Sequence, residues 1–253
     1  ARVPTGFVSE VRPRRSSRAL ETVADLLGEA AGVRVVQYGG LGAFSTVSIR
    51  GLPANEIAIL LDGVPLTSAA HGAVNLADLP VTAIDRIEIY RGATPIGLGA
   101  AAAGGAINLV SVDPSRPGPA ALAHDFAVTR GAFDSWEART TSSLTRGRLG
   151  MVAHGGYQGS AGDFAYADDN GTPFNLADDS VSVRRNNRFD AASAVVAATW
   201  DLGQALHLTL REDVFDKRQG LPGLGAAPAL HPRLWFTRAI TQLEVERADE
   251  GLV

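Results

Sequence analysis

The sequence has no cysteine among its 253 residues. This excludes a disulfide-stapled scaffold, a thiol nucleophile and a zinc or iron–sulfur site with cysteine ligands. Long apolar runs are also missing, because stretches such as Ile57–Leu61 have only the length of a strand and none approaches a membrane-spanning helix. The first 18 residues carry five arginines and no apolar core, so no signal peptide is expected in the sequence as it stands.

An excess of one charge is missing as well. The 23 Lys and Arg residues stand against 27 Asp and Glu residues, which gives a formal net charge of −4. A non-specific nucleic-acid binder normally carries a basic excess, so no nucleic-acid partner is expected. The apolar share of 45% and the charged share of 20% are those of a folded globular chain.

Glycine is plentiful instead, with 28 residues, or about 11% against an average near 7%. The pairs around Gly97-Leu98-Gly99 and Gly104-Gly105 do not have the spacing of a dinucleotide or phosphate loop. Tight turns and close approach of two backbones explain these glycines better. No G-x-S-x-G elbow and no H-E-x-x-H pair is present, and we expect no enzyme.

The chain changes character near Pro114–Pro119, where we expect a boundary. Before it, the apolar spacing in Arg18–Ala31 predicts an amphipathic helix that begins at Ser16 or Ser17 and ends at Gly32. Asn75–Leu79 reads as one helical turn. Short strands with glycine turns between them are expected at 33–37, 46–50, 57–61, 86–90 and 106–110. The first half is therefore a small α+β unit.

The second half alternates apolar and polar residues over strand lengths of about ten residues. In 205–215, for example, Leu206, Leu208 and Leu210 fall on one side and His207, Thr209 and Arg211 on the other. We expect strands at 121–130, 136–145, 148–158, 189–201, 205–215 and 234–247. Two links are short (146–147 and 202–204) and two are long (159–188 and 216–233). A membrane barrel and a half-exposed soluble sheet both give this pattern, which leaves the two open.

Several separated segments of the first half resemble the plug domain of TonB-dependent outer-membrane receptors. They stand in the family's order: ETVADLLGEAAGVRV, TVSIRG, IAILLDGVPL and IDRIEIYRGATPIGLGAAAAGGAINLVS, at 21–35, 46–51, 57–66 and 84–111. The resemblance implies an α+β plug domain followed by antiparallel transmembrane β-strands of an incomplete barrel, which in this family has 22 strands. It also implies the outer membrane of a Gram-negative cell as the location.

The resemblance implies four parts: an N-terminal periplasmic segment (1–18), a plug domain (19–113), a linker (114–120) and the first six barrel strands (121–253). The first part includes Gly6–Val11, a degenerate candidate for the TonB box. At roughly 10 residues per strand, 22 strands need about 220 residues before any loop. We therefore expect the chain to be a fragment or a truncated gene product.

The implied function is a receptor and transporter for a scarce ligand, such as a ferric siderophore or cobalamin. The partners implied are TonB with its inner-membrane energising complex, outer-membrane lipid, and a small chelate or nutrient. Two other classes stay open: a soluble α+β binding or adhesion protein, and an outer-membrane signalling receptor that does not transport.

The resemblance also implies roles for individual residues. Charged residues that follow or interrupt apolar strands are expected to form a charge network in the plug or to face the barrel wall: Arg50, Asp62, Arg86, Glu88 and Arg91. Glycines at the plug's turns are Gly51, Gly63, Gly92, Gly99, Gly104 and Gly105. Candidates for ligand contact in apical loops are Tyr38, Phe44 and His71.

The long link 159–188 is rich in carboxylates. Calcium takes six to eight oxygen ligands in flexible geometry, and some members of the family place calcium in early loops. The candidate ligands are Asp163, Asp168, Asp169, Asp178 and Asp179, although their spacing is not that of an EF-hand. A solvated acidic loop is the competing interpretation.

Overall fold

The computed structural model describes residues 8–13, 21–66, 73–92, 98, 104–114, 119–203, 206–225 and 227–247. The chain divides into two compact units, Ala1–Asp113 and Pro114–Val253. Within the described residues, no helix is long and apolar enough to cross a membrane.

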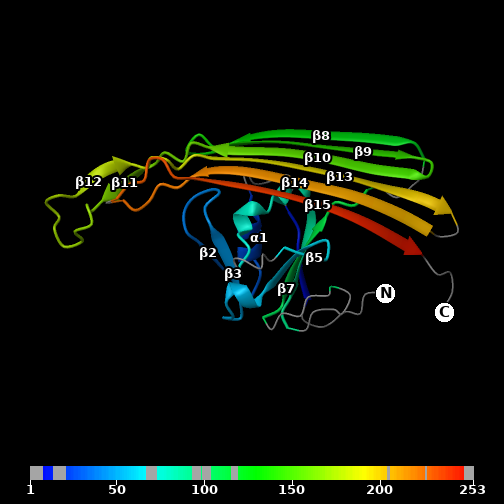
Figure 1. Cartoon of the computed structure of the whole chain (residues 1–253), viewed down its shortest axis with the longest axis horizontal. Helices are drawn as coiled ribbons and strands as arrows, with labels where there is room; N and C mark the ends of the chain where they lie inside the picture. Colours follow the sequence, from blue (N-terminus) through cyan, green and yellow to red (C-terminus); the bar gives the residue numbers. More distant parts are fainter. Residues whose placement is uncertain are drawn as a thin grey trace. The chain divides into compact units, whose positions relative to one another are not determined.

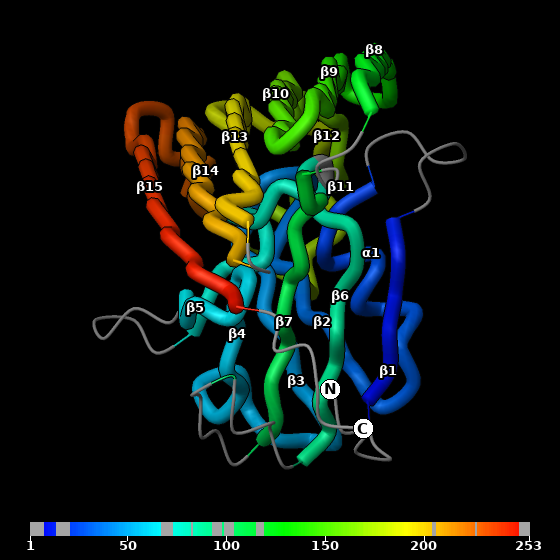
Figure 2. Tube along the Cα trace, turned by 90° about the vertical axis from the view of Figure 1, so that its right-hand side faces the viewer, coloured from blue at the N-terminus to red at the C-terminus, as the bar shows by residue number. Residues whose placement is uncertain are grey.

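The first unit is built around a mixed sheet with the strand order β1-β6-β7-β4-β5. Its strands are β1 (Val8–Val11), β4 (Ala58–Leu61), β5 (Val64–Pro65), β6 (Ile84–Tyr90) and β7 (Ala106–Ser111). Strands β4 and β7 run parallel, and the other neighbours run antiparallel. Figure 2 shows β7 between β4 and β6, with β1 beyond β6.

The strands β2 (Val33–Gln37) and β3 (Ser45–Ile49) form a separate hairpin in this unit. The helix α1 (Val23–Gly28) packs on this hairpin, and three short 3-10 turns connect the strands: η1 (Ala54–Glu56), η2 (Leu76–Asp78) and η3 (Val81–Ala83). The core consists of fully buried aliphatic side chains from the helix and the sheet, among them Leu26, Leu27, Ile49, Leu60, Ile87, Ile89 and Ile107.

The helix is shorter than the periodicity predicts. Its N-cap is Thr22, whose hydroxyl accepts a hydrogen bond from the backbone of Asp25, while the Asp25 carboxylate accepts one from the backbone of Thr22. With Thr22 as its N-cap, the helix begins at Val23 rather than near Arg18. The predicted caps Ser16 and Ser17 lie outside the described residues, and the predicted helical turn at 75–79 is η2.

Strand β1 lies before residue 19, where the sequence places the start of the plug. It pairs along its whole length with β6, from Val8 opposite Tyr90 to Val11 opposite Ile87. The sheet of this unit therefore includes residues of the segment that the sequence separates from the plug, and the boundary at residue 19 stays a prediction. The candidate TonB-box segment Gly6–Val11 overlaps a strand that is already paired.

The second unit contains one antiparallel sheet of six long strands, in the order β15-β14-β13-β10-β9-β8, and it is not closed. The strands are β8 (Ala121–Arg130), β9 (Trp136–Arg146), β10 (Leu149–Ser160), β13 (Phe189–Gly203), β14 (Leu206–Gly220) and β15 (Arg233–Arg247). All six predicted strands are present. Figure 1 shows them side by side, with a small hairpin of β11 (Ala165–Asp168) and β12 (Ser180–Val183) beyond their ends.

One face of the long sheet, here called the outward face, is apolar and exposed. Along β13 it carries Ala192, Ala194, Val196, Ala198, Trp200 and Leu202. The three large side chains among them, Val196, Trp200 and Leu202, are about half exposed. Polar side chains on this face pair across strands, such as His124 with Ser142 at 2.8 Å and Thr241 with Glu212.

The opposite face of the sheet is buried and carries charged side chains beside apolar ones such as Val195, Ala197 and Phe215. On β14 it carries Arg211, Asp213, Lys217 and Gln219, each less than a tenth exposed. A soluble sheet buries its apolar face and exposes its polar face, so this distribution is inverted. Strands with an apolar outer band and a polar inner face are those of a membrane barrel.

Candidate functional site

The turn between β4 and β5 places two polar residues at the edge of the mixed sheet. Asp62 and Gly63 have φ angles of 49° and 83°, the left-handed values of a two-residue hairpin turn. The Asp62 carboxylate accepts hydrogen bonds from the backbone N–H of Ser111 at 2.8 Å and from its hydroxyl at 2.5 Å. The backbone N–H of Gly63 donates to Oδ1 of Asn108 at 3.0 Å. The turn is thereby fastened to β7.

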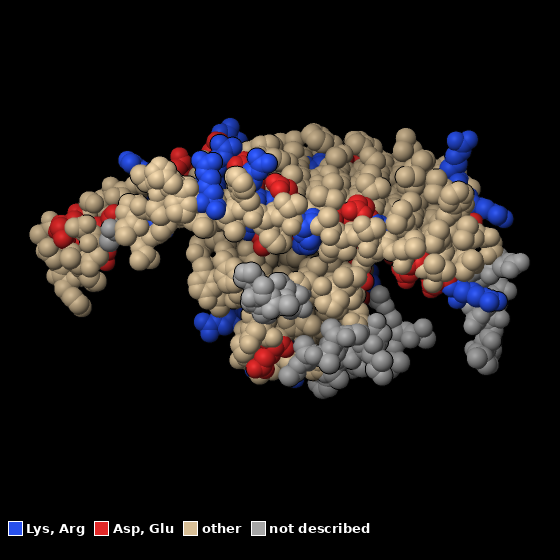
Figure 3. Space-filling view, viewed as in Figure 1, with Lys and Arg blue, Asp and Glu red and all other residues tan. Residues whose placement is uncertain are grey.

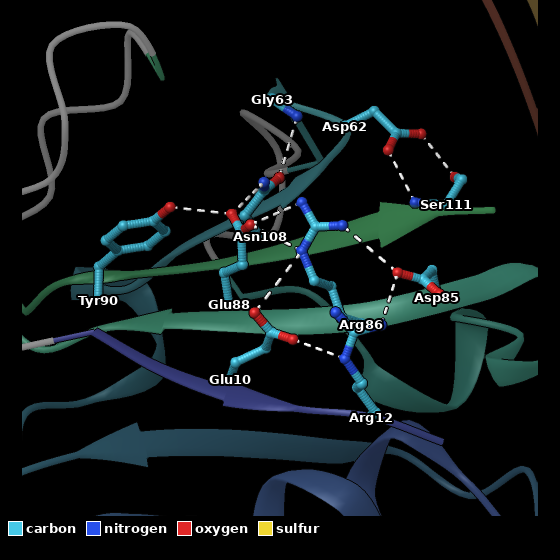
Figure 4. A network of polar contacts seen from close by, with 10 residues as sticks. All are labelled: Glu10, Arg12, Asp62, Gly63, Asp85, Arg86, Glu88, Tyr90, Asn108 and Ser111. Carbon is cyan, nitrogen blue, oxygen red and sulfur yellow. Dashed lines mark hydrogen bonds and ion pairs between the residues drawn. The ribbon is translucent and has the colours of Figure 1, made fainter. Parts of the chain in front are cut away.

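Glu88, at the middle of β6, is a buried carboxylate with partners on both oxygens. Its Oε1 accepts hydrogen bonds from Arg86 at 3.0 Å, and its Oε2 accepts from the Tyr90 hydroxyl at 2.9 Å and from the Asn108 amide at 3.1 Å. The residue is only 4% exposed. Figure 4 shows these side chains converging from β6 and β7. A buried charge is tolerated only with such partners.

The network continues to β1 through exposed charges. Arg12 pairs with Glu10 at 2.6 Å and with Asp85 at 3.1 Å. Asp85 also lies 3.4 Å from the Arg86 guanidinium, which has Glu10 at 3.9 Å on its other side. Burial lowers the pKa of Arg86, but the hydrogen bond and the charge of Glu88 outweigh it, so the pKa of Arg86 is raised. Arg86 therefore keeps its charge at every physiological pH.

Of the five charged residues expected to form a network, Arg86 and Glu88 are in direct contact. The Asp62 turn is linked to them through Asn108, which contacts the backbone of Gly63 and the Glu88 carboxylate. Arg91 lies apart and donates a hydrogen bond to the Ser9 hydroxyl at 2.6 Å, which is a second tie to β1. Arg50 lies in a tight turn with Gly51 at the end of β3. A role for any of these residues at a barrel wall stays a prediction.

Sequence reasoning missed the other members of the network: Glu10, Arg12, Asp85, Tyr90, Asn108 and Ser111. Their only signal in the sequence is alternation. Asp85 and Arg86 precede an apolar residue on β6, and Asn108 interrupts the apolar run of β7. The pairing register brings Glu10 opposite Glu88 and Glu88 opposite Asn108, and no local pattern fixes that register.

The predicted turn glycines fall into two groups. Gly51, Gly63 and Gly92 have positive φ angles, which glycine adopts without strain. Gly104 and Gly105 lie where backbones approach closely, since a Cβ on Gly104 would sit 2.8 Å from the carbonyl oxygen of Glu56. This is the close approach that the sequence analysis favours over a phosphate loop. Gly99 lies outside the described residues.

The apical-loop candidates Tyr38 and Phe44 come together. A backbone hydrogen bond from Tyr38 to Phe44 (2.9 Å) closes the loop, and their rings lie 5.8 Å apart. Tyr38 is 69% exposed, so its ring is available to a ligand. His71 lies outside the described residues. Contact of these rings with a ligand stays a prediction.

The acidic residues of the long link serve as local turn caps. Asp168 and Asp169 accept hydrogen bonds from the backbones of Asn170 and Gly171, and Asp178 accepts one from the Thr172 hydroxyl. In the part of the chain that the structure describes, no group of three or more His, Asp or Glu side chains could hold a metal ion, and neither Asp163 nor Asp179 joins one. Calcium binding in this link stays a prediction.

Polar contacts join neighbouring strands within each of the two units. The first unit has a sheet in which buried polar side chains tie β6, β7 and the Asp62 turn together, and more exposed charges tie β1 to β6. The long sheet has a polar face on which Arg238 pairs with Asp213 at 2.8 Å.

A comparison with family models matches residues 10–106 to the TonB-dependent Receptor Plug Domain. Among curated proteins, the "Vitamin B12 transporter BtuB" of Vibrio cholerae is 31% identical over 132 residues, or 52% of this chain and 21% of the relative. That of Vibrio vulnificus strain YJ016 is 35% identical over 95 residues, or 38% of this chain and 16% of the relative. The chain thus spans about a fifth of the length of these relatives, which are transporters and not enzymes.

Solved structures share the fold across both units. The "Copper transporter OprC" matches with a TM-score of 0.73 at 17% identity, covering 97% of this chain and 35% of that one. The "ferripyoverdine receptor of the outer membrane of Pseudomonas aeruginosa" matches with a TM-score of 0.60 at 19% identity, covering 83% of this chain and 25% of that one. The predicted fold class, a plug followed by antiparallel barrel strands, is confirmed.

Proposed function

We propose that this chain, which carries the plug domain of a TonB-dependent outer-membrane receptor and six antiparallel strands of the kind that begin its barrel, takes part in energised uptake of a small nutrient. The observation that carries the proposal is the pairing of this plug with an inverted sheet, apolar on its outward face and polar on the other. A soluble binding or adhesion protein would not expose such an apolar face.

For the nutrient we propose cobalamin. The support is the sequence identity of 31–35% over part of the chain with proteins named vitamin B12 transporters. The structures of siderophore and copper proteins share at most 20% identity with the chain, so they support the fold and not the ligand. A ferric siderophore is the second candidate, because ferripyoverdine and ferric enterobactin receptors share this fold.

The mechanism we propose follows from a globular plug within a wide barrel. Such an insert blocks diffusion, so passage requires a second conformation whose population an energy source raises. We infer that TonB, driven by the inner-membrane proton gradient, supplies that energy through the chain's N-terminal segment. One feature supports a pull on the N-terminal segment. Strand β1 lies at the edge of the sheet, and besides its pairing with β6 it is held by exposed ion pairs of Arg12, which contribute little stability.

The test is uptake by the receptor that contains these residues, produced in Gram-negative cells that lack their own cobalamin transporter. We expect cobalamin-dependent growth and uptake of labelled cobalamin in cells with TonB, and neither in matched cells without TonB. Uptake that is equal in the two strains would contradict energised transport.

Ferric siderophores, supplied one at a time to iron-limited cells, are the second arm. Growth on a siderophore with no cobalamin uptake would replace the proposed nutrient while leaving the receptor class intact. Binding of a ligand without uptake of any ligand would favour a signalling receptor.

A further inference from the structure

The loop between β11 and β12 contains a pair of residues whose backbone and side chain can react with each other. Asn170 is followed by Gly171 near the start of this loop. The chain has seven asparagines, and Asn170 is the one that precedes a glycine. Both residues of the pair are exposed, so water reaches them.

The pair forms the centre of a tight turn. Asn170 and Gly171 have φ angles of 50° and 74°, and the backbone N–H of Thr172 donates to the carbonyl oxygen of Asp169 at 2.8 Å. Positive φ at both central positions is typical of a type I′ turn, in which Asn-Gly is a preferred pair. The turn lies beyond the last pair of the β11–β12 ladder. It can therefore open without the loss of a strand pairing.

The atoms that would react are held by a carboxylate on one side and by nothing on the other. The backbone N–H of Gly171 donates to Oδ1 of Asp169 at 3.1 Å, which is within the reach of a general base. Among the described residues, no hydrogen bond holds the Asn170 side-chain amide. In the same loop, by contrast, the Asn175 amide oxygen accepts a hydrogen bond from the backbone of Ala177 at 3.3 Å. The Asn170 amide can thus rotate towards the nitrogen of Gly171.

We propose that Asn170 is a deamidation site and that Asp169 is the base that assists the reaction. Asp169 takes the proton from the backbone nitrogen of Gly171, and that nitrogen forms a bond to Cγ of Asn170. The bond from Cγ to the side-chain nitrogen breaks, and the proton leaves with that nitrogen as ammonia. Water then opens the five-membered ring. Cleavage of the new bond gives aspartate, and cleavage of the original main-chain bond gives isoaspartate.

The products change the charge and the shape of this loop. Figure 3 shows acidic side chains gathered at the hairpin, and the reaction adds one more carboxylate to Asp168, Asp169, Asp178 and Asp179. Like charges that are added beside one another disrupt local structure. Isoaspartate also lengthens the main chain by one carbon atom, so it does not fit the tight turn. The modification depends on this turn and not on which nutrient is transported.

The test is incubation of the folded receptor that contains these residues at neutral pH, followed by trypsin digestion and mass spectrometry. Cleavage after Arg148 and Arg184 leaves Asn170 and Asn175 in one peptide, so Asn175 is an internal control. Fragment masses locate the amide that is lost, and chromatography separates the isoaspartyl from the aspartyl peptide. We expect the loss at Asn170 to be at least about tenfold faster, since a glycine has no Cβ to hinder the attacking nitrogen. Equal rates at the two asparagines, or an Asn170 that keeps its amide, would overturn the proposed site.

The variant D169S tests the base. A serine hydroxyl can still accept the Gly171 N–H, but it is too weak a base to take the proton. We expect D169S to lose the Asn170 amide about tenfold more slowly than the parent, a smaller effect than that of a general base in an enzyme. In urea, where the turn is lost, the two proteins should react at the same rate. An equal rate in the folded proteins, or an equal slowing in urea, would overturn the role of Asp169.

Discussion

The Glu88 carboxylate shows how one residue can hold several strands of the plug unit together. It is buried and accepts hydrogen bonds from Arg86, Tyr90 and Asn108. The net worth of a buried ion pair is small, but removal of one partner leaves a charge in a place that cannot solvate it. Removal of only one member of the Arg86–Glu88 pair should therefore destabilise the unit more than replacement of both members by apolar residues.

We predict that R86M destabilises the chain by about 3–5 kcal/mol, while the double variant R86M/E88M recovers part of that loss. The reason is that Arg86→Met strands the Glu88 charge, whereas the double change removes both charges together. Urea unfolding of the chain in detergent, monitored by far-ultraviolet circular dichroism, measures the stability of both variants. The control is R12M, at an exposed pair in which the Arg12 and Glu10 side chains are 58% and 43% exposed, and it should cost less than about 1 kcal/mol. A double variant no more stable than R86M would refute the argument.

Gly105 is a second residue on which the plug unit depends. Its φ is +106°, and a Cβ there would lie 2.1 Å from the carbonyl oxygen of Tyr90. We predict that G105A costs more than about 3 kcal/mol, because the added atom forces β6 and β7 apart as well as straining the backbone.

The matched control for that prediction is G51A. Gly51 also has a positive φ, of +83°, but nothing lies within 4 Å of the added Cβ. Only the backbone strain of about 1–2 kcal/mol applies. The same urea unfolding measures both variants, and equal losses would show that the close approach to Tyr90 contributes nothing.

At the scale of elements, alternation in the sequence locates the strands that are long or apolar. All six strands of the long sheet and the plug strands β2, β3, β4, β6 and β7 are where the pattern predicts them, within a few residues. The ends are less well predicted. Strand β14 runs on to Gly220 because Lys217 and Gln219 continue its buried polar face, although Asp216–Gly220 reads as a loop in the sequence.

The elements that the sequence analysis misses are short and polar. Strand β1 has four residues and exists through pairing with the distant strand β6, from Val8 opposite Tyr90 to Val11 opposite Ile87. The hairpin β11–β12 lies in a link that reads as a solvated acidic loop. The Glu88 network is missed for the same reason, since its members meet only after the strands are in register.

The two long loops of the second unit are fastened by the side chains of Asn186 and Arg184, the latter of which donates a hydrogen bond to the carbonyl oxygen of Gly223. The Asn186 amide nitrogen lies within hydrogen-bonding distance of the carbonyl oxygens of Leu221 (3.1 Å), Ala229 (3.0 Å) and Pro232 (2.9 Å). Asn186 itself has a φ of 54°. The segment that carries the β11–β12 hairpin is thereby tied to the 221–232 loop.

We predict that N186G raises the rate of tryptic cleavage after Arg184 and Arg185 roughly tenfold, because loss of a few hydrogen bonds of about 1 kcal/mol each favours local opening. Glycine keeps the positive φ, so the change removes the side chain without adding strain. The control is N170G, another asparagine of positive φ, at 50°, in the same link. Cleavage that rises equally in both variants would show that the amide contacts do not hold the loops.

At the scale of the whole molecule, the long sheet with its exposed apolar face favours the proposed membrane receptor over a soluble protein with the same alternation. The sequence alone leaves that choice open, because alternation gives two faces without saying which one is buried. The choice follows from the match of the first unit to a plug domain and from the burial of Arg211, Asp213 and Lys217 on the sheet's polar face. In the proposed receptor, the outward face would meet lipid along its middle.

That assignment predicts a cost that depends on depth. Ala198 lies on the outward face of β13, opposite Met151 on β10 and Leu210 on β14, whereas Leu202 lies on the same face near the end of the strand. In the receptor that contains these residues, A198R should destabilise the protein folded in lipid vesicles by about 2–4 kcal/mol, and L202R should destabilise it by about 0–1 kcal/mol. Guanidinium titration of the vesicle-folded protein measures both. In detergent micelles, where a flexible surface lets the arginine reach water, the difference should shrink, and equal costs in vesicles would mean that the outward face does not meet the hydrocarbon core.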